Sequence, residues 1–241
     1  MLKDSESAEL KSPVNKKRKL VQFFVLFVLV FGPACFLILI SLNKCEHKFE
    51  QLPTYGKLPD FEFSTSSGKK INSGTQEGKI TIYSTIQIGC PEDCAIDLLK
   101  FNLMLYQHYR KYQKKMGHIK FISIATDNEG NPVDNIEELE FMLSDIVEDY
   151  DSSIWTIVTG DPKQIYNIEN NDINLLEIRD DSSYALKPYL EMLLIVDKLN
   201  NVRLARRGNK EGYIRDFKEH VALLQKQYDK EAYNERNHNT K

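Results

Sequence analysis

The stretch GKITIYSTIQIGCPEDCAIDLLKF, residues 78 to 101, places two cysteines between a strand pattern and a helix pattern. Residues 79–88 are rich in β-branched and aromatic side chains, which predicts a buried strand. From residue 95 to about residue 115, apolar residues recur at the spacing of one helix face: Ile96, Leu99, Leu103, and Tyr106 or Tyr109. We therefore expect Cys90 and Cys94 in the loop that leaves a core strand and enters the first long helix.

The alternation of strand and helix patterns continues toward the C-terminus. Further strands are predicted at residues 61–64, 119–125, 153–158, 192–197 and 202–206, and helices at residues 135–149 and 211–230. A βαβ half joined to a ββα half is the thioredoxin-like arrangement, an α/β fold with a mixed central sheet flanked by helices. We predict this domain over residues 58–230, followed by a polar tail at residues 231–241.

The N-terminal part of the chain has the composition of a membrane anchor. Residues 20–42 carry no charge and are long enough to form a single transmembrane helix. Because four basic residues at 16–19 precede this run, residues 1–19 are predicted to be cytoplasmic and the C-terminal domain to be exported, facing a periplasm or an intermembrane-space-like compartment. The polar residues 43–57 are predicted to be a linker.

A cleaved signal peptide is the alternative to an uncleaved anchor. We favour the anchor because the apolar run is longer than the apolar region of a signal peptide, and because no small-x-small cleavage pattern follows it.

Charge argues against nucleic acid as a partner. Residues 1–19 carry six basic and three acidic side chains, so a net charge of −3 for the whole chain leaves −6 on the remaining residues. An acidic exported domain is not suited to binding a phosphate backbone.

Two of the four cysteines lie outside the close pair. Cys35 falls within the apolar run and is interpreted as a small apolar residue, whereas Cys45 is either free or cross-linked between molecules. In an oxidising exported compartment, Cys90 and Cys94 form a disulfide unless a reductant or a metal keeps them apart.

The close pair is suited to three roles. A helix N-terminus favours the thiolate, which is the form that attacks disulfides and binds soft metals, although Glu92 and Asp93 oppose this effect. The spacing places the sulfurs roughly one helical turn apart, where they can exchange with a disulfide or hold Cu(I). The third role is a purely stabilising disulfide, but so short a loop gains little entropy.

The cysteine loop and several other segments resemble the SCO/SenC proteins. The loop is Gly89-Cys90-Pro91-Glu92-Asp93-Cys94, behind a membrane anchor. Further matches are Leu58-Pro59-Asp60-Phe61, Gly68-Lys69, Ile122-Ser123-Ile124 with Asp127, Trp155-Thr156, Thr159-Gly160-Asp161, and Leu194-Ile195-Val196-Asp197. The resemblance spans about residues 52 to 226. It implies a thioredoxin fold, copper binding, and a role in supplying the CuA centre of cytochrome c oxidase.

The sequence departs from the family at the third copper ligand. Family members add a histidine about eight residues before the aspartate that ends the core strand, and in this chain Tyr189 falls near that place relative to Asp197. None of the five histidines fits: His47, His108, His118, His220 and His238. Ala95 also replaces the proline that usually follows the second cysteine.

Without the histidine, two kinds of chemistry remain for the cysteine pair, namely copper binding and disulfide exchange. A phenol is a poor ligand for Cu(I), so copper would be held by Cys90 and Cys94 alone or with a further group. The same loss favours thiol–disulfide exchange, with Cys90 attacking and Cys94 resolving.

The resemblance predicts a membrane-anchored copper-delivery protein, or a thiol reductase for the CuA site, acting on a cytochrome c oxidase subunit or another exported thiol protein. The alternatives are a thiol–disulfide oxidoreductase that binds no copper, and a redox-inactive interaction module.

Overall fold

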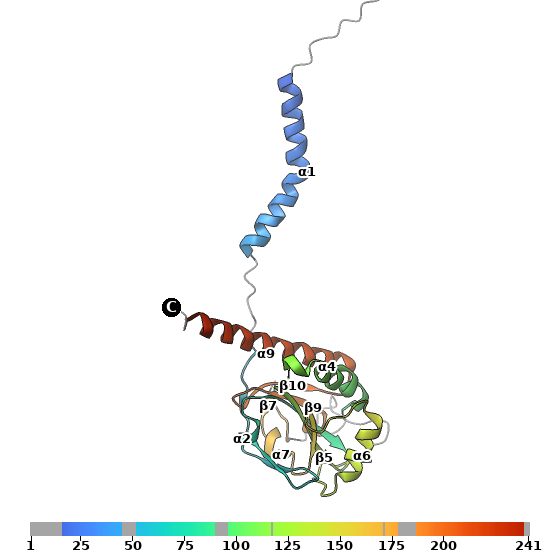
Figure 1. Ribbon diagram of the computed structural model, residues 1–241. Helices are drawn as coiled ribbons and strands as arrows, with labels where there is room; N and C mark the ends of the chain where they lie inside the picture. The colour runs from blue at the N-terminus through green and yellow to red at the C-terminus, as the bar shows by residue number, and fades with distance from the viewer. Residues whose placement is uncertain are drawn as a thin grey trace, which may run out of the picture. The chain divides into compact units, whose positions relative to one another are not determined.

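The computed structural model describes residues 16–44, 52–89, 96–116, 118–170, 172–177 and 187–238. The chain divides into two compact units, residues 1–49 and residues 50–241. The first unit contains helix α1 (Lys16–Lys44) (Figure 1), whose segment Leu20–Ile38 is long and apolar enough to cross a membrane. Its length and composition suit either an anchor or a signal sequence.

The second unit is built on a six-stranded sheet. Its strand order is β1-β10-β9-β4-β5-β6. The strands are β1 (Gly56–Lys57), β4 (Ile80–Gln87), β5 (Ile119–Thr126), β6 (Trp155–Val158), β9 (Met192–Val196) and β10 (Asn201–Arg207). Strands β4, β5 and β6 run parallel, whereas β9 is antiparallel to both β4 and β10. The predicted mixed sheet is therefore confirmed.

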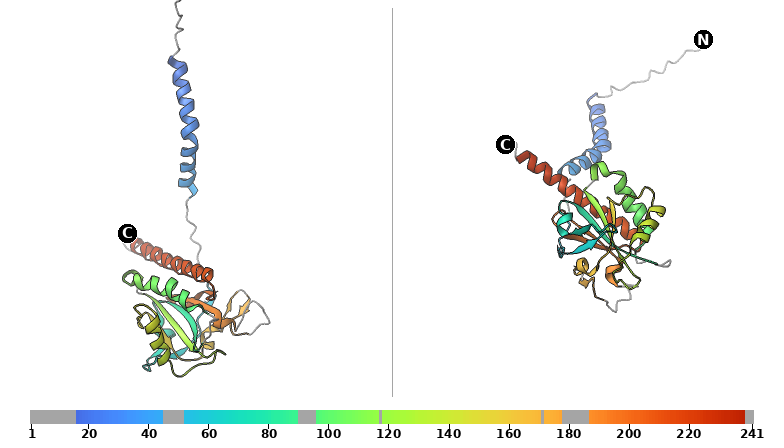
Figure 2. Two further views of the ribbon diagram at one scale, coloured as in Figure 1. Left: turned by 90° about the vertical axis from the view of Figure 1, so that its right-hand side faces the viewer. Right: turned by 60° about the horizontal axis from the view of Figure 1, so that its bottom comes forward.

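Both faces of the sheet are covered, which explains why every residue of β4 except Gln87 is buried. One face packs against α3 (Leu98–Phe101), η1 (Asn102–Tyr106), α4 (Gln107–Lys111), α6 (Glu137–Ile146) and α9 (Glu211–His238). Figures 1 and 2 show α9 and α4 on the same side of the sheet.

The opposite face packs against a hairpin and two short helices. These are β2 (Glu62–Ser64) with β3 (Lys70–Asn72), α7 (Lys163–Tyr166) and α8 (Pro188–Glu191). The remaining elements are α2 (Ser73–Gln76), α5 (Gln113–Met116), β7 (Glu169–Asn170) and β8 (Ile173–Asn174).

The predicted helix over residues 95–115 is present but buries a different face. Its middle segment, η1, is a π-helical turn, which places an extra residue in the turn and shifts the side chains that follow. The buried side chains are Phe101, Leu105, Tyr106 and Tyr109. Leu99 is 67% exposed and Leu103 is 60% exposed, so the prediction that these two leucines lie on the core face is wrong.

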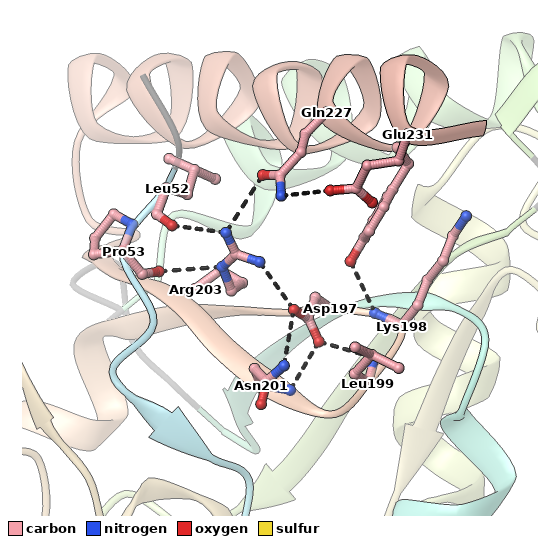
Figure 3. Close-up of polar contacts among 10 residues, drawn as sticks. Leu52, Pro53, Asp197, Lys198, Leu199, Asn201, Arg203, Gln227 and Glu231 are labelled. Carbon is pink, nitrogen blue, oxygen red and sulfur yellow. Dashed lines mark hydrogen bonds and ion pairs between the residues drawn. The ribbon is translucent and has the colours of Figure 1, made fainter. Parts of the chain in front are cut away.

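A buried arginine binds the first described residues of the second unit (Figure 3). Arg203 on β10 donates to the main-chain oxygens of Leu52 (2.6 Å) and Pro53 (3.1 Å). Its guanidinium also contacts the Asp197 carboxylate at 3.0 Å. Asp197 in turn accepts from the backbone N–H groups of Leu199 and Asn201, which closes the turn between β9 and β10. The strands predicted at residues 192–197 and 202–206 therefore form an antiparallel hairpin.

Candidate thiol site and its surroundings

The predicted cysteine pair lies between two described flanks. Cys90, Cys94 and the rest of residues 90–95 are outside the described residues. On the first flank, β4 ends at Gln87, Ile88 donates its N–H to Thr126 at 2.8 Å, and Gly89 has a φ of +69°. On the second flank, α3 begins at Leu98. The flanks thus agree with the prediction of a loop between a core strand and a helix start.

Asp97 caps the helix that follows the loop. Its carboxylate accepts the Lys100 backbone N–H at 2.9 Å, and its own N–H donates to the Gly208 oxygen at 2.9 Å. Burial alone would raise the pKa of the Asp97 carboxyl, but hydrogen bonds from the Lys100 side chain and backbone lower that pKa below its ordinary value. The Asp97 carboxylate therefore stays negatively charged at the start of α3. This charge reduces the stabilisation that the helix dipole gives to a nearby thiolate.

A largely buried ion pair, which the sequence did not predict, lies beside the second flank. The Glu191 carboxylate, with 2% of its side chain exposed, lies 3.8 Å from the Arg207 guanidinium and accepts from the Asn209 amide at 3.4 Å. The Gly208 N–H donates to the Glu191 main-chain oxygen at 2.8 Å. No local sequence signal marks this pair, because α8 and the end of β10 meet only in the folded chain.

Gly208 also fixes the position of the second flank. A side chain at this glycine would place its Cβ 3.1 Å from both Ile96 and Leu193. The absence of a side chain therefore lets the start of α3 pack closely on the end of β10.

Tyr189, predicted near the place of the missing histidine, is fully buried. Its hydroxyl donates to the Gly130 oxygen at 3.2 Å, and its ring contacts Tyr166 with the ring centroids 6.1 Å apart. Burial, together with the negative charges of Asp161 and Asp127, raises the pKa of the Tyr189 phenol. A protonated, hydrogen-bonded phenol in the core is a poor donor to a soft metal.

The described residues offer no other metal site. No group of three or more His, Cys, Asp or Glu side chains that could hold an ion occurs within this described part of the chain. His108 lies on α4, His118 precedes β5, and His220 on α9 contacts the Asp216 main-chain oxygen at 2.7 Å. His47 is outside the described residues, and His238 ends α9.

We predict that Tyr189→Phe leaves Cu(I) affinity unchanged. The substitution removes a hydroxyl that bonds only to Gly130 among the described residues, so it should lower the free energy of unfolding by about 0.5–1.5 kcal/mol. Competition against a chromophoric Cu(I) chelator measures the affinity, and urea unfolding measures the stability. Tyr166→Phe is the matched control, because the Tyr166 hydroxyl donates to the Met192 oxygen at 3.0 Å. A tenfold loss of affinity confined to Tyr189→Phe would contradict this prediction.

An apolar groove opens beside the first flank. It has a volume of about 530 Å³ and is lined by Ile88, Gly89 and Ile96 next to the cysteine loop, and by Met142 and Ile146 on α6. Met142 is 40% exposed and Ile146 is 56% exposed. Exposed apolar side chains gathered at a groove are typical of a surface that contacts another chain.

Solved structures of known proteins share this architecture. A structure of BsSco, a member of the Sco family of cytochrome c oxidase assembly proteins, superposes with a TM-score of 0.50 at 12% identity, and the match covers 73% of this chain and 97% of that one. The chain has a thioredoxin-like α/β fold.

Other solved structures are similar at lower scores. A SCO1/SenC family lipoprotein from Bacillus anthracis str. Ames gives a TM-score of 0.47 at 18% identity, covering 68% of this chain and 95% of that one. A thiol peroxidase from Chromobacterium violaceum gives 0.46 at 16% identity, covering 74% and 90%. No protein-family model and no curated protein matches the chain. The structural neighbours thus include Sco/SenC proteins, in agreement with the resemblance seen in the sequence.

Proposed function

We propose that the chain is a membrane-anchored, Sco-like protein that acts through the thiols of Cys90 and Cys94. In this proposal it delivers copper to, or reduces the thiols of, the CuA site during assembly of cytochrome c oxidase. The observation that supports the proposal is the position of the two described flanks: one follows the end of a core strand, and the other leads into a capped helix start. The fold shared with BsSco supports it.

Of these two activities, we favour thiol reduction. The Tyr189 phenol is buried and donates to Gly130, so it is not positioned to replace the histidine that the family uses for copper. A Cu(I) ion would then depend on two thiolates, with no third ligand identified. Thiol–disulfide exchange needs only the two cysteines.

The proposed thiol–disulfide exchange has two steps. The Cys90 thiolate attacks one sulfur of a client disulfide, which forms a mixed disulfide and releases the other client sulfur as a thiolate that takes up a proton. The Cys94 thiolate then attacks the Cys90 sulfur, which releases the second client thiol and leaves a Cys90–Cys94 disulfide. Two electrons pass to the client, and an exported dithiol protein would return the pair to its reduced form.

The groove beside the loop supports a protein client. Its apolar lining next to Gly89 and Ile96 would receive apolar side chains that neighbour the client's cysteines. Acidic side chains on α6, including Glu137 and Glu138, would favour a client segment with basic residues.

A pair of titrations on the same samples tests the proposed function. The full chain, purified in a neutral detergent and fully reduced, is titrated for Cu(I) by chelator competition and for its thiol–disulfide equilibrium in glutathione buffers. Cys90→Ser and Cys94→Ser should each abolish reversible disulfide formation, whereas Cys45→Ser should leave it unchanged. Tight binding of one equivalent of Cu(I), lost in both variants of the pair, would establish the copper activity.

A redox-inactive interaction module would give a different result in these titrations. If the wild-type pair neither holds copper against the chelator nor cycles between dithiol and disulfide, both proposed activities fail. The domain would then be an interaction module.

The membrane part of the proposal rests on α1. We propose that it stays as an uncleaved anchor, with residues 1–19 in the cytoplasm and the thioredoxin-like domain exported. Recovery of an N-terminal epitope tag on the membrane-bound protein would support this, and its loss from the mature protein would indicate a cleaved signal.

A further inference from the structure

A second, polar basin lies at the other end of β4 from the cysteine loop. It has a volume of about 670 Å³ and is bounded by the turn between β2 and β3, by α2, and by the starts of β5 and β6. Lysine and hydroxyl side chains form most of its lining. Lys79 in its lining precedes β4 and the cysteine loop follows that strand, so the eight residues of β4, roughly 26 Å, separate Lys79 from the loop.

Four lysines from three parts of the chain line the basin. Lys69 and Lys70 belong to the hairpin, Lys79 immediately precedes β4, and Lys120 lies on β5. Strand pairing brings the last two together, because Lys120 lies opposite Thr81, two residues after Lys79. Such a set comes together only in the folded domain.

Among the residues that the structure describes, three of these four lysines have no carboxylate partner. Lys70 forms an ion pair with Glu62 at 2.9 Å, but no ion pair involves Lys69, Lys79 or Lys120 within the described part of the chain. Instead, the Lys79 ammonium donates to the Thr75 oxygen at 2.6 Å, and the Lys120 ammonium donates to the Ser153 oxygen at 2.9 Å. Neutral acceptors thus hold two positive charges in fixed positions without cancelling them.

The acidic groups nearby do not neutralise the basin. Glu140, whose carboxylate accepts the Ser66 hydroxyl at 2.6 Å, is the one acidic side chain in the lining and offsets only one of its lysines. The Asp151 carboxylate accepts the Ser153 N–H at 2.8 Å, and although it senses the charge of Lys120 it is not part of the lining. An excess of positive charge therefore remains inside a domain that is acidic as a whole.

The pKa of Lys79 reflects this excess in addition to burial. Partial burial, together with the positive charges of Lys120 and Lys69, lowers the pKa of the Lys79 ammonium. Repulsion among cations held in one basin is relieved when an anion binds between them, so the charge distribution favours an anionic ligand.

We propose that this basin binds a compact oxyanion of the phosphate class, held by Lys69, Lys79 and Lys120 with hydroxyl groups of the surrounding turns. Thr65, Ser67 and Ser152 are among the lining hydroxyl groups that can donate to phosphate oxygens. The volume lies within the range of small-molecule sites and suits a phosphate group with a small organic part. Charge-assisted hydrogen bonds from ammonium groups supply the affinity.

Inorganic pyrophosphate and glycerophosphoglycerol are the probes that test the proposal. The full chain in neutral detergent is titrated with each by isothermal calorimetry at pH 7 and low salt. Lys79→Gln and Lys120→Gln should each weaken pyrophosphate binding by about tenfold or more, since hydrogen bonds to charged groups contribute about 1.5–3 kcal/mol. Lys57→Gln and Lys163→Gln, which remove exposed lysines outside the basin, should change the affinity less than twofold.

The two probes distinguish the sources of the phosphate. Binding of pyrophosphate alone indicates a free, multivalent ligand, whereas equal, lysine-dependent binding of glycerophosphoglycerol indicates an anionic lipid headgroup. The proposal is overturned if neither probe binds at millimolar concentration, or if Lys79→Gln and Lys120→Gln both fold like the wild type and bind as it does. Because the assay does not involve Cys90 or Cys94, its result is separate from that of the thiol titrations.

Discussion

Replacing Trp155 by alanine is expected to lower the free energy of unfolding by about 3–5 kcal/mol. Trp155 is fully buried on β6, and its ring lies 5.1 Å from Phe101 and 5.2 Å from Tyr106, measured between ring centroids. Its indole N–H donates to the Ser123 hydroxyl at 2.9 Å. The substitution removes the aromatic contacts and opens a cavity between β6 and the helix that follows the cysteine loop.

Urea unfolding followed by far-ultraviolet circular dichroism measures this loss. Fluorescence is unsuitable, because Trp155 is the sole tryptophan of the chain. Tyr233→Ala is the matched control, since Tyr233 is 61% exposed on α9 and its loss should change stability by less than about 0.5 kcal/mol. A loss below about 1 kcal/mol for Trp155→Ala would mean that the described aromatic cluster does not stabilise the domain.

Replacing Asp197 by alanine is expected to cost a similar amount, about 3–5 kcal/mol, for an electrostatic reason. The side chains of Asp197 and Arg203 are 2% and 9% exposed, so the substitution leaves a guanidinium buried without its counter-charge. The same carboxylate accepts the backbone N–H groups of Leu199 and Asn201, and the turn between β9 and β10 loses both hydrogen bonds (Figure 3).

An exposed ion pair provides the control for Asp197→Ala. Arg206 and Asp216 lie 3.1 Å apart with 32% and 42% of their side chains exposed, so Asp216→Ala should cost less than about 1 kcal/mol. Asp197→Ala combined with Arg203→Met should recover part of the loss, because no unpaired charge then remains. If the two aspartate substitutions cost the same in urea unfolding, burial of the Asp197–Arg203 pair has no special weight.

Sequence patterns predicted the elements that depend on local periodicity. Residues 79–88 were predicted as a buried strand, and both faces of β4 are covered; the strands predicted at residues 192–197 and 202–206 are β9 and β10. The helix after the cysteine loop was also predicted, but its buried face was not. The buried face runs through Phe101, Leu105 and Tyr109, and this series is also spaced like one helix face, so periodicity alone did not show that Leu99 and Leu103 point away from the core.

The contacts that the sequence could not predict join distant parts of the chain. The Glu191–Arg207 ion pair joins α8 to the end of β10. The residues that line the polar basin range from Thr65 to Thr156 in the sequence. For Tyr189, counting along the chain gave its approximate position, but only the fold shows that its hydroxyl faces Gly130.

The hydrogen bonds from Arg203 to Leu52 and Pro53 also affect how a pulling force would pass into the domain. A pull on the N-terminal end of the chain reaches these two carbonyls first, and then the pairing of β1 with β10, where Tyr55 donates to Val202 and Leu58 to Asn200. These bonds lead the force into the hairpin of β9 and β10, while β4, the strand that leads to the cysteines, lies beyond β9 in the sheet. A force applied at this end of the domain is thus expected to reach β1, β10 and β9 before it reaches β4, the strand that precedes the thiols.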